Sequence, residues 1–183
     1  MIYHFSLKSV GLTVAILLIV THVFAMLSSA SVRTALRHFP RNKQMGTALL
    51  LIVAIWSFYL IETMDLGEFS PSRNMMLVAI PIAAGLTWKI IDELLAVRAL
   101  GMLALLAAEP LLEAAFLKAP ESRLFLVVLA YAWIIAGLFW VGMPYTLRDQ
   151  IKWITENSAR WNAAVIGGAV YGVVLLVCSL MYY

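Results

Sequence analysis

ALGMLALLAAEPLLEAAFL, residues 99–117, is the stretch that decides the fold of this chain. It is long enough and apolar enough to cross a bilayer, because about 20 apolar residues of helix span the hydrocarbon core. It also carries Glu109, Pro110 and Glu113 within that span. A carboxylate inside a membrane is costly, so its presence requires a hydrogen-bond partner or a function.

The composition of the whole chain agrees with a lipid solvent. Of the 183 residues, 63% are hydrophobic and 13% are charged, and the mean hydropathy is +0.93. A soluble domain has about 25% charged residues, so this chain cannot cover itself with a polar surface. We therefore predict one membrane-embedded helical domain over residues 1–183. Little chain is left for a separate catalytic domain, which disfavours an enzyme.

The other apolar runs predict further membrane spans. They are continuous rather than alternating, which favours helices over the strands of a membrane barrel. The predicted fold class is an all-α, polytopic integral membrane protein, a bundle of about six transmembrane helices with short loops. The predicted spans are residues 10–29, 46–62, 74–88, 99–117, 124–143 and 163–183. Segments predicted to lie at the membrane interface are 31–44, 89–98 and 145–161.

Segment 89–98, KIIDELLAVR, is the hardest to place, because it contains no Gly or Pro that would mark a turn. Lys89 and Glu93 have the i,i+4 spacing of a helical pair. We interpret the segment as an amphipathic helix at the interface. The alternative is that the third span is long and continues past the membrane surface.

The basic residues predict an orientation, because cytoplasmic loops carry an excess of Lys and Arg. If residues 31–44 lie inside, nine of the 13 basic residues lie inside and both termini lie outside. The nine are Arg33, Arg37, Arg41, Lys43, Lys89, Arg98, Arg148, Lys152 and Arg160; the other four are Lys8, Arg73, Lys118 and Arg123. We predict a multi-pass protein of a prokaryotic-type inner or plasma membrane. The net charge is only +3, and the sequence contains no dense run of basic residues, which argues against a nucleic-acid partner.

Polar residues in four spans are predicted to reach a similar depth. A helix rises 1.5 Å per residue, so a span entered at residue 99 reaches the midplane near Glu109, with Glu113 one turn further out. The same counting brings His22, Tyr131 and Tyr171 close to that level. We expect a polar layer around Glu109, with these five residues as candidates for a proton or ion path.

Two interpretations of this layer remain open. Pro110 has no N–H, so the carbonyl of Leu106 loses its usual partner next to the two acids. A kinked helix with two carboxylates and a free carbonyl is a reasonable proton or cation site. The alternative is a protonated Glu109 that forms a hydrogen bond to a neighbouring helix and holds the bundle together.

His22 is also a candidate ligand for a haem or a pigment. A haem held by two imidazoles needs a second histidine inside the bundle, and His4 and His38 lie in the predicted outer and inner segments. Lys89 lies at a helix end, which disfavours a Schiff base in the membrane. No cofactor is indicated by a motif.

The remaining motifs favour packing over chemistry. Gly168 and Gly172 form a GxxxG pattern, which is typical of close helix packing and also of contact with a partner subunit. The single cysteine, Cys178, behaves as a small apolar residue. Glu62, Asp65 and Glu68 have a spacing that could gather a divalent cation, but acidic outer loops are generally solvated, so we predict neither a metal site nor catalytic residues.

These observations predict an integral membrane subunit of a larger membrane assembly, with a mid-membrane polar layer around Glu109. Its partners would be the lipid bilayer and other membrane subunits or a second copy of the chain. One alternative is a small proton- or cation-coupled transporter or channel that uses Glu109 and Glu113. Another is a membrane redox or pigment-binding protein that uses His22.

Overall fold

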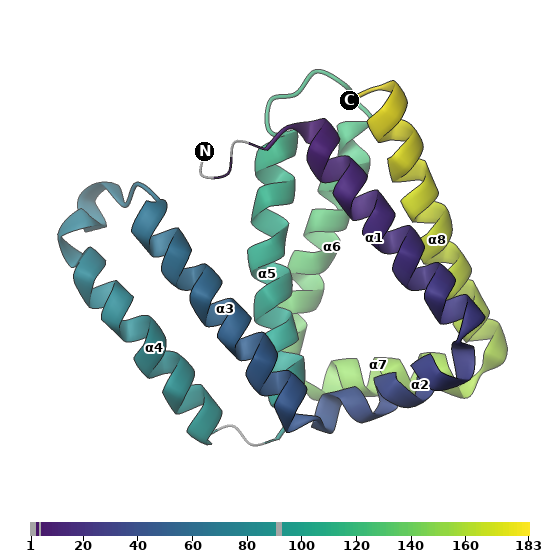
Figure 1. The fold of residues 1–183 in the computed structure, drawn as a ribbon, viewed down its shortest axis with the longest axis horizontal. Coiled ribbons are helices and arrows are strands. Elements are labelled where there is room, and N and C mark those ends of the chain that lie inside the picture. Colours follow the sequence, from purple (N-terminus) through teal and green to yellow (C-terminus); the bar gives the residue numbers. More distant parts are fainter. Residues whose placement is uncertain (1–2, 4, 91–92) are drawn as a thin grey trace.

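The computed structural model describes residues 3, 5–90 and 93–183, and within them the chain is helical almost throughout (Figure 1). Five helices are long and apolar enough to cross a membrane. These are α1 (Leu7–Leu27), α3 (Lys43–Thr63), α5 (Leu95–Ala115), α6 (Arg123–Gly142) and α8 (Ser158–Met181). The other elements are α2 (Ser29–His38), the 3-10 turns η1 (Phe39–Arg41) and η2 (Gly67–Ser72), α4 (Arg73–Ile90) and α7 (Tyr145–Glu156).

The predicted all-α, multi-pass class is thus confirmed in its coarse form, with five candidate spans among the described residues. The predicted span at residues 74–88 falls in α4, which has 18 residues. Arg73, Asn74 and Lys89 lie within α4 and lower its apolar character. A sixth span therefore remains a prediction.

The long helices associate in pairs, α1 with α8 and α5 with α6, while α3 packs on α5 and α4 packs on α3 (Figure 1). Glycines make close approach possible. A Cβ on Gly101 of α5 would lie 2.9 Å from the carbonyl oxygen of Gly137 in α6, and a Cβ on Gly137 would lie 2.8 Å from that of Gly101. A Cβ on Gly46 of α3 would lie 2.8 Å from the backbone nitrogen of Ala96 in α5. Small residues let helices meet in lipid, where packing replaces hydrophobic attraction.

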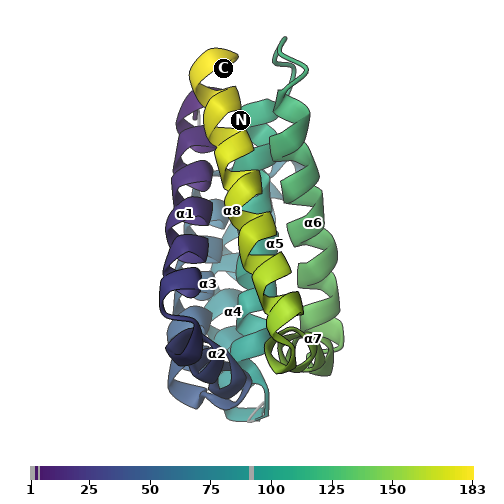
Figure 2. The same cartoon turned by 90° about the vertical axis from the view of Figure 1, so that its right-hand side faces the viewer.

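Two amphipathic helices, α2 and α7, lie across one end of the bundle (Figures 1 and 2). Leu147 and Ile151 of α7 form a buried cluster with Val97 at the start of α5. Arg37 of α2 donates to the hydroxyl and the carbonyl oxygens of Thr155, both at 2.9 Å. Thr155 is only 2% exposed, so this arginine joins the two helices at a buried point.

The two termini lie at the end opposite α2 and α7 (Figure 1). The nine basic residues of the predicted inner side belong to α2, η1 and α7, or to the ends of α3, α4, α5 and α8 that lie nearest to them. The basic bias is therefore a property of one end of the molecule. The side of the membrane to which this end belongs stays a prediction.

The segment at 89–98 differs from both expectations. Residues 89–90 complete α4, and α5 begins at Leu95, four residues before the predicted start; residues 91–92 lie outside the described residues. Leu94 has φ +57°, a left-handed conformation that residues other than Gly rarely adopt. Its side chain packs against the cluster of Val97, Leu147 and Ile151. Tertiary packing thus supports a turn that the local sequence does not signal.

Other boundaries shift by a few residues from the predicted ones. The predicted interfacial segment 145–161 divides into α7 and the first turn of α8, because Asn157 caps α8 through its side-chain oxygen. The predicted segment 31–44 becomes α2, η1 and the start of α3, where Asn42 provides a similar cap.

Candidate functional site

Glu109 and Glu113 lie together in a groove on the flank of the α5–α6 pair. We call it the acid groove; its volume is about 490 Å³. The two carboxylates share one face of α5, as their i,i+4 spacing predicts. The other residues that line the groove are apolar: Leu105, Ala108 and Leu112 from α5, Phe116 directly after α5, and Ile134 from α6.

Glu113 is bound by the segment that precedes α1. The backbone N–H of Tyr3 donates to both carboxylate oxygens of Glu113, at 3.4 and 3.3 Å. The phenol oxygen of Tyr3 accepts a hydrogen bond from the indole nitrogen of Trp56 in α3. Burial raises the pKa of the Tyr3 phenol, the Trp56 hydrogen bond lowers it, and the nearby charges of Glu109 and Glu113 raise it again. Tyr3 therefore remains neutral and links α3 to the end of α5.

Glu109 has a different environment. Its carboxylate makes no hydrogen bond or ion pair with any other residue in the described part of the chain, and its side chain is half-buried. Since α5 spans Leu95–Ala115, its centre lies near Leu105, and Glu109 lies about one turn beyond it toward the termini. Because the helix starts at Leu95 rather than at residue 99, Glu109 does not lie at its centre, and the depth of Glu109 in the membrane stays a prediction.

The structure does not bring His22 to the acid groove. His22 lines a separate cavity of about 350 Å³ between α1, α2, α7 and α8. Its Nδ1 lies 2.8 Å from the carbonyl oxygen of Leu18, and its ring lies against Gly168 of α8, where an added Cβ would overlap Nε2. Among the described residues, no second histidine, cysteine or methionine lines this cavity. Within this cavity, the described residues therefore offer His22 no second imidazole of the kind that a two-histidine haem requires.

The two tyrosines are also elsewhere. The hydroxyl of Tyr171 donates to the carbonyl oxygen of Phe125 at 2.6 Å, which joins α8 to the first turn of α6. Tyr131 is 55% exposed on α6 and lines neither the acid groove nor the His22 cavity. The structure therefore does not bring these residues together around Glu109, because depth counting did not include the rotation of each helix; whether they share one depth in the membrane stays a prediction.

Gly168 and Gly172 are occupied within the chain. A Cβ on Gly172 would lie 2.9 Å from Cγ1 of Ile19 and 3.1 Å from its backbone nitrogen. Together with the contact of Gly168 with His22, this places the GxxxG face against α1. The motif packs helices within this chain, which is one of the two roles expected for it.

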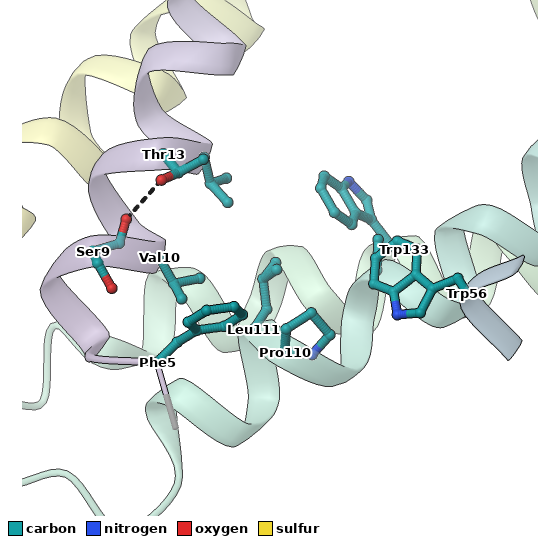
Figure 3. Close-up of a pocket in the computed structure, with 10 residues that line it drawn as sticks. Phe5, Ser9, Val10, Thr13, Trp56, Pro110, Leu111 and Trp133 are labelled. Atoms are coloured by element: carbon teal, nitrogen blue, oxygen red, sulfur yellow. Dashed lines mark hydrogen bonds between the residues drawn. The ribbon is translucent and has the colours of Figure 1, made fainter. Parts of the chain in front are cut away.

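An apolar cavity of about 340 Å³ between α1, α3, α5 and α6 was not anticipated from the sequence (Figure 3). Trp56, Trp133 and Pro110 lie on one side of it, and Phe5 and Val10 lie on another. The polar groups at its edge are already used: the hydroxyl of Thr13 donates to the carbonyl oxygen of Ser9 at 2.9 Å. The cavity suits an apolar group. Tryptophans placed within the spans rather than at their ends were the signal that could have revealed it.

The acidic residues near η2 do not form a metal site. In the part of the chain that the structure describes, no group of three His, Cys, Asp or Glu side chains is placed to hold a metal ion. Asp65 instead accepts the backbone N–H of Gly67 at 2.9 Å. Arg73 donates to the carbonyl oxygens of Glu62 and Met64 at the end of α3. These contacts stabilise the turn between α3 and α4.

Comparison with known proteins adds no family: no protein-family model, curated protein or solved structure matches this chain. The five apolar helices indicate the class, a multi-pass helical membrane protein.

Proposed function

We propose that this chain is an integral membrane subunit of a larger membrane assembly, and that the acid groove is where a neighbouring subunit binds. The observation that supports this most is Glu109, a carboxylate without a partner among the described residues, in an otherwise apolar groove. A carboxyl group in an apolar, lipid-facing position is costly, and a donor from another subunit would satisfy it.

The arrangement of α4 is a second support. None of its 18 residues is buried, and its main contacts among the described elements are with α3 and the adjacent turn η2 (Figure 1). Gly85 of α4 has open space where a side chain would be. We further propose that α4 is the sixth span and that the basic end of the molecule faces the inside of the cell.

The experiment is extraction in a mild detergent followed by native mass spectrometry of the wild-type chain and of two variants. We expect the wild type to carry additional subunits or a second copy, and Glu109→Leu to lose them. The matched control is Glu121→Gln in the exposed loop before α6, which should assemble as the wild type does. The proposal is overturned if the wild type is alone, or if Glu109→Leu retains its partners.

A second candidate is proton or cation transport by Glu109 and Glu113, because the two carboxylates share one groove. This transport mechanism does not use His22, Tyr131 or Tyr171. Flux into proteoliposomes with Glu109→Gln and Glu113→Gln tests it. Unchanged flux in both variants would remove these residues from any transport mechanism.

A further inference from the structure

Positive charge is concentrated in a cleft between α2, η1 and α7, at the end of the molecule opposite the termini. We call it the cationic cleft; its volume is about 390 Å³. Its charged and polar side chains are Arg37, His38, Arg41, Arg148, Lys152 and Glu156. A second hollow of about 310 Å³ next to Glu93 shares Arg41 and Arg148 with the cleft.

Neither helix forms this cleft alone. Arg148 and Lys152 are four residues apart on one face of α7, and Arg37 and Arg41 have the same spacing across α2 and η1. The two faces are brought together by Arg37, whose Nε and Nη2 both donate to the buried Thr155 of α7. The walls of the cleft are therefore tied to each other.

The charges of the cleft are only partly compensated within the chain. Arg148 pairs with the adjacent Asp149 at 2.9 Å, and Lys152 contacts Glu156 at 3.8 Å. Arg41 makes no hydrogen bond or ion pair with the residues that the structure describes. Guanidinium groups bind phosphate oxygens in a bidentate way, so an excess of arginine in a cleft favours a phosphate ligand.

We propose that the cationic cleft binds the phosphate group of an anionic phospholipid. A lipid is favoured over a free phosphate because α2 and α7, which form the cleft, lie beside the ends of the apolar helices (Figure 1). Trp153 on the same helix, α7, is 57% exposed, and tryptophan is enriched at the level of lipid headgroups. Clusters of Lys and Arg next to membrane spans recognise anionic lipids.

The test is native mass spectrometry of the delipidated protein in detergent, titrated with phosphatidylglycerol. Phosphatidylcholine and inorganic phosphate serve as the two comparison probes. The variant is Arg41→Gln/Arg148→Gln, which leaves the Arg37–Thr155 contact in place. The matched control is Lys8→Gln/Lys118→Gln, which removes the same charge from the end that carries the termini.

We expect Arg41→Gln/Arg148→Gln to weaken phosphatidylglycerol binding about tenfold or more, and the control to leave it unchanged. Arg41→Lys/Arg148→Lys keeps the charge but not the bidentate guanidinium geometry, so its binding should lie between that of the wild type and that of the glutamine variant. The proposal is overturned if both double glutamine variants lose binding equally, since the attraction would then be diffuse. It also fails if phosphatidylcholine binds as tightly, if inorganic phosphate displaces the lipid at equal concentration, or if the lysine variant loses as much binding as the glutamine variant.

Discussion

The α1–α8 pair and the α3–α4 hairpin are both formed by two long helices, yet they are packed differently. In the α1–α8 pair, a Cβ on Gly11, Gly168 or Gly172 would lie less than 3.0 Å from an atom across the interface. In the hairpin, Gly85 of α4 has nothing within 4 Å, and α4 buries no residue. The α1–α8 pair has backbones in close contact, whereas α4 has most of its surface free.

This difference follows from the solvent. Apolar side chains gain little by leaving lipid for one another, so helices in a bilayer associate through close packing and hydrogen bonds. The α1–α8 pair has the close packing, and α8 is further joined to α6 by the hydrogen bond of Tyr171 and packs directly on α7. The hairpin is joined to the rest of the bundle by the contact of α3 with α5 and by Tyr3. Its outer helix, α4, has no buried residue, in contrast to both helices of the α1–α8 pair.

The largest expected effect comes from filling the closest contact of the α1–α8 pair. In Gly168→Leu the new side chain must displace the ring of His22, which should lower the free energy of unfolding by about 3 kcal/mol. Gly85→Leu is the control, because open space surrounds it, and it should change stability by less than about 0.5 kcal/mol. Thermal unfolding in detergent measures both. Similar losses for the two variants would contradict the proposed difference between the pair and the hairpin.

The next effect concerns the contact between α2 and α7 that Arg37 makes with the buried Thr155. Arg37→Ala removes two hydrogen bonds to the buried Thr155 and should cost about 2 kcal/mol. Arg41→Ala, in the same cleft but without such bonds, should leave the unfolding temperature almost unchanged. If the two variants unfold at the same temperature, Arg37 does not support the fold in the way described.

A smaller effect distinguishes the two acids of α5. Glu113→Gln weakens the hydrogen bond from Tyr3, which helps to link the hairpin to α5, and should destabilise the isolated chain by about 1 kcal/mol. Glu109→Gln loses no bond among the described residues, so the isolated chain should be as stable as the wild type or slightly more so. Unfolding of the detergent-solubilised monomer measures both variants. A larger loss for Glu109→Gln would show that its carboxylate already has a partner within the chain.

The smallest effect lies at the end of the α1–α8 pair that is farthest from α2 and α7. The hydroxyl of Tyr183 donates to the carbonyl oxygen of Ser122 at 2.8 Å, and burial raises the pKa of this phenol to about 12. A raised pKa means that folding favours the protonated phenol, so its stabilisation is complete below pH 10 and is lost as the pH rises through 12. Tyr183→Phe should cost about 1 kcal/mol or less at neutral pH. The difference from the wild type should shrink between pH 10 and 12 in a thermal unfolding series; a constant difference would exclude titration of Tyr183 as its cause.

Much of the fold could be predicted from local sequence because its signals are local. The length of an apolar run identifies a candidate span, an i,i+4 spacing places Glu109 and Glu113 on one face, and basic residues mark one end of the bundle. The turn at Leu94 could not be predicted in this way. Its left-handed backbone is supported by packing against Leu147 and Ile151, more than 50 residues away in the chain.

The candidate site depended more on the tertiary structure. Depth counting treated His22, Tyr131 and Tyr171 as possible neighbours of Glu109, whereas each of them lies on a surface set by the rotation of its helix. The contact between Gly101 and Gly137 is a second example. The sequence shows that α5 and α6 follow one another, but it does not show which sides of the two helices face each other.

The sequence by itself determined that this is a helical membrane protein, which runs are its candidate spans, and that its basic residues gather at one end. These properties follow from the free energy of transferring side chains into lipid and from the periodicity of a helix. Both depend only on the residues within one segment of the chain. Only the tertiary structure decided which faces meet: His22 against Gly168, Glu109 in the acid groove without a partner among the described residues, and the arginines of α2 and α7 in the cationic cleft. The reason is that helix rotation and pairing depend on contacts between distant segments, and hydropathy contains no information about them.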